Sequence, residues 1–268
     1  MIDIKIQEEL RNKYNPEGSL LRAQQMRMLE ILSYIDNICK KNNITYWLSS
    51  GTLLGAVRHE GFIPWDDDLD IEMLEDDFKR FKDVMSKEKG KYELQTHETD
   101  SSYLAPYAKV RDLSSYLKEE NSNDLFYKYH GIYVDVFCLE PNNSIILTKI
   151  SGAFQYLLFT LNKIPYHFIR KPLVYISYNF TYKCIFPIIR FLSRLGNKEQ
   201  LRHIHGSAFW DIRNKEDLYP IKEIKFEDKY YPCPNNSHNV LTKIYGDYMQ
   251  LPTENQIKPH WNKLVIYE

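Results

Sequence analysis

The sequence predicts an α/β (α+β) domain in which helices flank a mixed sheet. Two observations support this fold class. Amphipathic helical segments alternate with short strand-like segments over residues 16–137, and the composition then changes over residues 141–198. We expect the 268 residues to form a single domain over 1–268, with a helical insertion near 141–200.

The individual elements follow from hydrophobic spacing. Residues 16–43 are expected to form a helix because Met28, Leu32 and Ile35 recur at helical spacing. Residues 75–87 form a second predicted helix, with Phe78 and Phe81 on one face. Strands are expected at residues 44–48, 68–72, 92–96, 103–111 and 131–137.

A run of aspartates is the first candidate for chemistry. In residues 68–72 the acids alternate with apolar residues, so Asp68 and Asp70 are expected to share one face of a strand. Two carboxylates on one face can bind Mg²⁺, a hard cation that prefers oxygen ligands, with Mn²⁺ as the alternative ion. The other interpretation is a solvated acidic turn. Asp66 and Asp67 are expected to form the turn after Pro64 or to support the site.

Residues 49–52, Ser-Ser-Gly-Thr, come directly before a helix-compatible run over residues 53–58. A small turn that opens a helix leaves backbone N–H groups free to bind an anion. Gly51 and Thr52 are therefore expected to lie beside a phosphate, shortly before the paired carboxylates.

Two later segments add charged residues to this site. Asp135 alternates with apolar residues over 131–137, and a carboxylate in such a strand needs a positive partner, which a bound metal would supply. Lys109 and Arg111 should share a strand face, where two cations would suit phosphate ligands. The alternative for Lys109 and Arg111 is a solvated strand edge.

These motifs resemble two groups of known proteins. A Gly-Thr turn, a short helix and an Asp-x-Asp strand are similar to the signature of the nucleotidyltransferase superfamily. The longer stretch over residues 51–71, from Gly-Thr-Leu-Leu-Gly through Asp-Asp-Asp-Leu-Asp-Ile, resembles the LicD family of phosphotransferases, which includes the fukutin-related proteins. The resemblance continues at 106–111, at 135–138, where Cys138 replaces the usual proline, and at Tyr-Gly-Asp-Tyr over 245–248.

The resemblance implies a nucleotidyltransferase-like sheet and Mg²⁺-dependent transfer of a phospho-alcohol, most often phosphocholine. The implied donor is a CDP-alcohol, the acceptor is a sugar hydroxyl of a lipopolysaccharide, teichoic acid or capsule precursor, and CMP leaves. Asp68, Asp70 and Asp135 would bind the metal, and Asp135 would also accept the hydroxyl proton. Gly51, Thr52 and Arg58 would bind the diphosphate.

Two other functions share these residues. A true nucleotidyltransferase would use an NTP and release pyrophosphate, and a scaffold of the same fold would have lost the chemistry. The three aspartates argue against the scaffold, because degeneration usually removes a ligand.

Composition narrows the partners. A net charge of −1 gives no global basic field, so no nucleic acid is expected. The first ten residues carry acids and no long apolar run, which predicts a cytoplasmic protein without a signal peptide. Residues 141–198 contain no Asp or Glu, and their basic and aromatic residues fit either a packed helical insertion or peripheral contact with the inner face of the membrane, where a lipid-linked sugar acceptor would lie.

Overall fold

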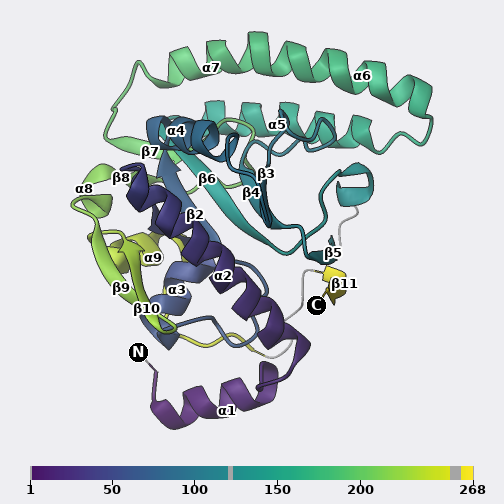
Figure 1. The fold of residues 1–268 in the computed structure, drawn as a ribbon. Coiled ribbons are helices and arrows are strands. Elements are labelled where there is room, and N and C mark those ends of the chain that lie inside the picture. Colours follow the sequence, from purple (N-terminus) through teal and green to yellow (C-terminus); the bar gives the residue numbers. More distant parts are fainter. Residues whose placement is uncertain (1, 120–122, 254–260, 268) are drawn as a thin grey trace.

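The computed structural model describes residues 2–119, 123–253 and 261–267, and its centre is a mixed sheet (Figure 1). Within the described residues this sheet has seven strands: β1 (Trp47–Leu48), β2 (Asp70–Leu74), β3 (Tyr92–Gln95), β4 (Ala108–Asp112), β6 (Tyr133–Pro141), β7 (Gln200–His203) and β8 (Arg213–Asn214). Their order is β1-β2-β6-β4-β3, with β7 joining β6 to β8. β2 and β6 are parallel and the other pairs are antiparallel, which confirms the predicted mixed sheet.

The helices surround this sheet. They are α1 (Ile4–Tyr14), α2 (Leu20–Lys41), α3 (Ser50–His59), α4 (Glu75–Met85), α5 (Ile145–Asn162), α6 (His167–Phe180), α7 (Phe186–Ser193), α8 (Lys215–Leu218) and α9 (Ser237–Tyr245). A 3₁₀ turn spans Asn123–Phe126, and a π turn, Thr181–Ile185, joins α6 to α7. Two small antiparallel sheets pair β5 (Ser115–Glu119) with β11 (Trp261–Ile266), and β9 (Lys222–Phe226) with β10 (Lys229–Cys233).

The two predicted amphipathic helices form and cover the apolar side of the sheet. The Ser19 hydroxyl accepts a hydrogen bond from the Arg22 N–H and so caps α2, while three acids in the first turn of α4 suit its dipole. The buried stripe of α2 and the buried Phe78 and Phe81 of α4 join Ile71 and Val136 in one core cluster. Figure 1 shows α2 lying across the sheet.

Strand alternation gives the sheet a second, polar side. Ile71, Met73, Val134 and Val136 are fully buried in the core. The residues between them along β2 and β6 project to the opposite side, because successive side chains of a strand alternate. This side carries the charged residues predicted for the site.

Several element boundaries differ from the predicted ones. α3 begins at Ser50, so Gly51 and Thr52 lie in its first turn, and β2 begins at Asp70, after Asp68. The strand predicted from residue 103 begins at Ala108, because Pro106 lacks the N–H needed for a ladder. The strand predicted over 44–48 contains only Trp47 and Leu48, which pair with β2.

The segment near 141–200 is helical, as predicted, and lies between β6 and β7. In Figure 1 the helices α5, α6 and α7 form a layer at one end of the molecule, far from α1. Within the described ranges, no helix combines the length and apolar character needed to cross a membrane.

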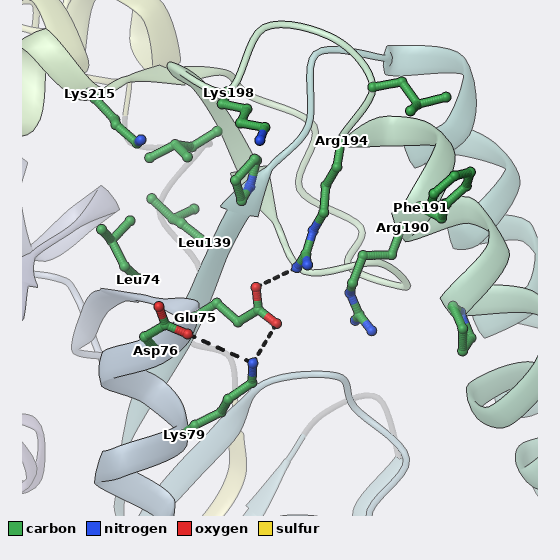
Figure 2. Close-up of a pocket in the computed structure, with 14 residues that line it drawn as sticks. Leu74, Glu75, Asp76, Lys79, Leu139, Arg190, Phe191, Arg194, Lys198 and Lys215 are labelled. Carbon is green, nitrogen blue, oxygen red and sulfur yellow. Dashed lines mark hydrogen bonds and ion pairs between the residues drawn. The ribbon is translucent and has the colours of Figure 1, made fainter.

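Charged side chains join this helical layer to the sheet (Figure 2). Arg194, which follows α7, pairs with Glu75 at the start of α4, and Glu75 also lies 2.8 Å from the Lys79 ammonium. Arg190 lies 2.6 Å from Glu140 of β6, a fully buried carboxylate. These pairs border a cavity of about 720 Å³ at the carboxyl ends of β2 and β6.

Candidate active site

Three of the predicted site residues lie in one row across three neighbouring strands. Asp70 of β2 is paired in register with Asp135 of β6, and Asp135 is paired with Lys109 of β4. The Lys109 ammonium lies 2.9 Å from Asp135 Oδ1 and 3.2 Å from Oδ2. Sequence alternation placed these residues on the correct strand face, and the register of the sheet brings them together.

The start of α3 meets this row from the side of β1. The Asp70 N–H donates to the Thr52 hydroxyl at 2.8 Å, and the Ser49 N–H donates to the Asp70 carbonyl at 3.1 Å. Thr52 is buried, so its hydroxyl holds the first residue of β2 in place. The structure therefore assigns Thr52 a positioning contact with Asp70.

Gly51 faces the aspartate run. A Cβ atom at residue 51 would lie 2.9 Å from Asp66 Oδ2 and 3.9 Å from Asp68 Oδ1. The absent side chain thus lets these two carboxylates approach the first turn of α3, where the helix dipole favours negative charge. Asp66 was predicted to form the turn or to support the site, and its carboxylate lies directly beside Gly51.

The aspartate carboxylates repel one another. Burial raises the pKa of Asp70 well above its usual value, and the carboxylates of Asp68, Asp135 and Asp66 raise it further, while Lys109 opposes the shift. Burial also raises the pKa of Asp135, against the opposing effect of Lys109. A cluster of this kind favours the approach of a cation.

The metal site itself remains a prediction. In the part of the chain that the structure describes, no group of three His, Cys, Asp or Glu side chains is arranged to hold a metal ion. The Lys109 ammonium pairs with the Asp135 carboxylate in this structure. The oxygen donors near Gly51, from Asp66 and Asp68 beside Asp70, have the chemistry that Mg²⁺ requires.

Arg111 shares the strand face of Lys109, as predicted, but its hydrogen bonds all go to neighbouring protein groups. Its guanidinium is fully buried and donates to Gln95 Oε1 at 2.7 Å, to the Gly131 carbonyl at 2.9 Å and to Glu119 at 2.8 Å. These contacts close it off from a substrate, so the predicted phosphate contact finds no support here. Lys109 alone of this pair reaches the carboxylate row.

Arg58 is also committed to contacts within the protein. Its side chain is buried, and it donates to the carbonyls of Tyr248 at 2.8 Å and Gln250 at 3.2 Å, and to His59 Nε2 at 2.9 Å. The predicted diphosphate contact is therefore not evident in this arrangement. Arg58 instead holds the segment that follows α9 against α3.

A cavity of about 590 Å³ opens beside the aspartates. Gly51, Arg58, Trp65 and Asp66 line one wall, and the Tyr-Gly-Asp-Tyr segment contributes Tyr245 and other residues to the facing wall. Burial and the carboxylates of Asp70, Asp66 and Asp68 raise the pKa of Tyr245, which places its hydroxyl near the acidic cluster. Tyr245 is the first residue of the Tyr-Gly-Asp-Tyr motif, which the sequence shows, but the sequence alone did not assign Tyr245 to the site.

Glu72 is a second residue that sequence reasoning missed. It follows Asp70 on the same face of β2 and is buried between Trp47 Nε1 at 2.9 Å, Arg213 at 3.0 Å and His203 at 3.2 Å. Burial opposes ionisation, but Arg213 and His203 outweigh it and lower the pKa of Glu72. The alternation over residues 68–72 places it on this face, whereas its partners from β8 and β7 are distant in sequence.

Comparison with known proteins identifies the family of this chain. The family described as LicD/FKTN/FKRP, nucleotidyltransferase domain, matches residues 43–181, a range that includes the whole carboxylate row. The lipopolysaccharide cholinephosphotransferase LicD of Haemophilus influenzae is 30% identical over 263 residues, covering 90% of this chain and 95% of that protein. The human ribitol 5-phosphate transferase FKRP is 34% identical over 61 residues, covering 23% of this chain and 12% of that protein.

The two transferases are similar to different lengths of this chain. The match to the Haemophilus protein extends over nearly its full length, whereas the match to the human protein is local. The matched family range contains α3, β2, β4 and β6, the elements that position the aspartates and Lys109. The chain therefore belongs to the LicD/FKTN/FKRP family.

Proposed function

We propose that this protein transfers a phospho-alcohol, phosphocholine being the first candidate, from a CDP-activated donor to a sugar hydroxyl of a cell-surface glycan precursor, with release of CMP. The row of Asp70, Asp135 and Lys109 beside the start of α3 is the observation that carries the proposal. The row adjoins the start of α3, where Gly51 and the Asp66 carboxylate line a 590 Å³ cavity, and its carboxylates and ammonium suit chemistry on an anionic phosphate. The near full-length similarity to a cholinephosphotransferase supports the choice of alcohol.

The aspartates fit a divalent cation by their chemistry. We propose that Asp68 and Asp70 hold Mg²⁺, or alternatively Mn²⁺, with Asp135 completing the set. When bound, the ion would neutralise charge on the phosphate oxygens. The mutual repulsion that raises the pKa of Asp70 supports this assignment, because a bound cation would relieve it.

The protein's own groups have separate tasks in this proposal. The acceptor hydroxyl attacks the phosphorus that carries the alcohol, the bond from that phosphorus to the CMP oxygen breaks, and the hydroxyl proton passes to Asp135. The buried environment that raises the pKa of Asp135 suits it to accept this proton. Lys109, held over the Tyr133 ring at 3.3 Å, would balance the charge that develops beside Asp135.

A nucleotidyltransferase reaction is the second candidate, because the matched family domain has that name. The same carboxylates would then act on the α-phosphate of an NTP, and pyrophosphate would leave. Both reactions begin with attack on a phosphoanhydride, so the carboxylates alone do not distinguish them. The leaving group does, because one reaction releases CMP and the other releases pyrophosphate.

The test is a product assay with the full chain. CDP-choline, CDP-ethanolamine, CDP-glycerol, CDP-ribitol and CTP are each incubated with Mg²⁺ and delipidated lipopolysaccharide or teichoic acid, and CMP and pyrophosphate are measured. We expect CMP and labelled glycan from one CDP-alcohol. Pyrophosphate from CTP, without CMP from any CDP-alcohol, would establish the second candidate.

The site is tested in the same assay. Asp68→Asn and Asp70→Asn should each lower turnover by two or more decades, about 3 kcal/mol or more of barrier, with little change in melting temperature. Asp76→Asn is the matched control, because its side chain is 98% exposed at the other end of β2 and should leave turnover unchanged. Wild-type turnover in both site variants would remove Asp68 and Asp70 from the mechanism.

A further inference from the structure

Helix α5 buries three polar side chains beside Leu158, while several of its large apolar side chains are exposed. Its core-facing positions include Thr148, Ser151 and Gln155, all buried. The Gln155 amide donates to the Leu104 carbonyl at 2.6 Å and its oxygen accepts from the Tyr182 hydroxyl at 2.9 Å. Its buried side is therefore satisfied by hydrogen bonds, which leaves the apolar residues of the helix on its outer side.

Large apolar side chains are exposed along the whole insertion. We define the insertion face as the large apolar side chains of residues 145–195 that are exposed. It comprises Ile145, Ile146, Ile150, Tyr156, Leu157, Tyr166, Phe168, Ile169, Leu173, Tyr175, Ile176, Phe180, Ile188, Phe191, Leu192 and Leu195. Phe168 and Tyr156 are 76% and 74% exposed. So many exposed apolar side chains on one segment mark an interaction site.

The charge of the same segment indicates which partner binds the insertion face. Residues 141–198 contain no acid, and their basic residues are Lys149, Lys163, Arg170, Lys171, Lys183, Arg190, Arg194 and Lys198. Arg190 and Arg194 pair with Glu140 and Glu75, and Arg170 is buried, so the exposed charges of the segment are its lysines. A second copy of this chain, related by two-fold symmetry, would bring these lysines together. Anionic lipid head groups would instead attract them, by about 1 kcal/mol for each Lys or Arg near the surface.

We propose that the insertion face lies on the surface of an anionic bilayer, with α5, α6 and α7 along the membrane plane. The apolar side chains would enter the boundary between head groups and acyl chains, and the exposed lysines would contact the head groups. In Figure 1 α6 and α7 form the outermost layer at one end of the molecule, and α5 lies on their sheet side.

A cavity beside α6 gives a lipid phosphate a place to bind. Arg170 is only 6% exposed and lies over the Phe126 ring at 3.4 Å, and among the described residues no carboxylate pairs with it. Arg170, Lys171 and Ser102 line a cavity of about 430 Å³, which Tyr175 of the insertion face also borders. An Arg and a Lys in one cavity suit the phosphate of an anionic phospholipid.

Binding is tested by sedimentation of the full chain with phosphatidylcholine vesicles that contain or lack phosphatidylglycerol. We expect the protein to pellet with the anionic vesicles at low salt and to be partly released at high salt. Phe168→Ser combined with Tyr175→Ser should weaken binding at least tenfold. Tyr230→Ser is the matched control, because Tyr230 is 63% exposed on the β9–β10 hairpin and should leave binding unchanged.

The charge contribution is tested separately. Lys163→Gln with Lys171→Gln should weaken binding at low salt, whereas Lys41→Gln with Lys89→Gln, an exposed pair outside the insertion, should not. Arg170→Gln should reduce the preference for phosphatidylglycerol while the melting temperature shows that the variant is folded. Lys171→Gln tests the same cavity from an exposed residue, should Arg170→Gln fail to fold.

Two results would overturn the proposal. One is the absence of sedimentation with anionic vesicles at low salt. The other is a stable dimer in light scattering that Phe168→Ser with Tyr175→Ser abolishes, which would make the insertion face an interface between copies. Neither measurement uses a donor or acceptor substrate, so the outcome is independent of the proposed transfer activity.

Discussion

At the scale of single residues, charge in the site is set by what each group faces across the sheet. Asp135 faces Lys109 at hydrogen-bond distance, whereas the pKa of Asp70 is raised by burial and by the other aspartates. At the end of α3, the neighbouring Arg58 likewise sets the charge state of His59. The buried His59 accepts a hydrogen bond from Arg58, so it must stay neutral in the folded protein.

His59 should therefore make stability depend on pH. Burial, aided by Arg58 and Arg11, lowers the pKa of His59 from 6.5 to about 3. Between these values the unfolded chain takes up a proton that the folded protein does not, so stability falls as pH is lowered from about 6.5, by up to about 1.4 kcal/mol per pH unit. In urea titrations His59→Gln should reduce this slope by the contribution of one histidine, because burial also lowers the pKa of His97 and His205. The same change at the exposed His167 should leave the slope unaltered. An unaltered slope in His59→Gln would show that this histidine is protonated in the folded protein.

At the scale of elements, α3 depends on two glycines with different neighbours. Gly55 faces backbone, since a Cβ there would lie 2.5 Å from the Gly61 carbonyl oxygen. Gly51 faces the end of the Asp66 side chain, which can move. Both glycines allow α3 to pack closely, but only Gly51 lies against the carboxylates of the site.

Substituting alanine should separate these two roles. Gly55→Ala should lower the free energy of unfolding by about 1–3 kcal/mol, because backbone must shift to admit the methyl group. Gly51→Ala should keep stability within about 1 kcal/mol, since alanine favours helix and Asp66 can turn away, yet lower turnover at least tenfold by displacing that carboxylate. Denaturant titration and the transfer assay measure the two effects. A stable Gly55→Ala variant, or a fully active Gly51→Ala variant, would contradict this view of α3.

At the scale of the whole molecule, one buried carboxylate connects the insertion to the catalytic sheet. Glu140 is fully buried. Its carboxylate lies 2.6 Å from Arg190 and 3.6 Å from Arg194, and it accepts a hydrogen bond from the His205 N–H at 3.0 Å. These contacts join β6, α7 and the end of β7. The same strand, β6, carries Asp135 nearer its start, so the site and the insertion share one structural element.

Glu140→Gln should loosen the insertion more than the site. Removing the charge leaves Arg190 without its carboxylate, whereas Arg194 keeps its pair with Glu75, and breaking a buried ion pair costs about 3–5 kcal/mol. Hydrogen exchange should therefore accelerate in residues 145–193 while β2 stays protected. Glu199→Gln is the control, because its carboxylate pairs with Lys215 while 67% exposed and should change stability by less than about 1 kcal/mol. Equal acceleration in β2 and the insertion would show that the two regions unfold together.

The sequence by itself determined the elements whose signals are local. Hydrophobic spacing predicted α2 and α4, and alternation predicted which faces of β2, β4 and β6 carry Asp70, Lys109 and Asp135. Motif resemblance predicted the family that the comparisons confirm. Each of these signals lies within a short stretch of chain, where side-chain periodicity follows from backbone geometry alone.

Only the tertiary structure decided what each charged group contacts. The burial of Arg111 against Glu119 and the contacts of Arg58 with Tyr248 and Gln250 depend on strand pairing and loop packing between distant segments. The same holds for Glu72, whose partner Arg213 is 141 residues away. A cation on a strand can serve a phosphate or a buried carboxylate equally well by sequence, and the choice between them is made by which opposite charge the folded chain brings within reach.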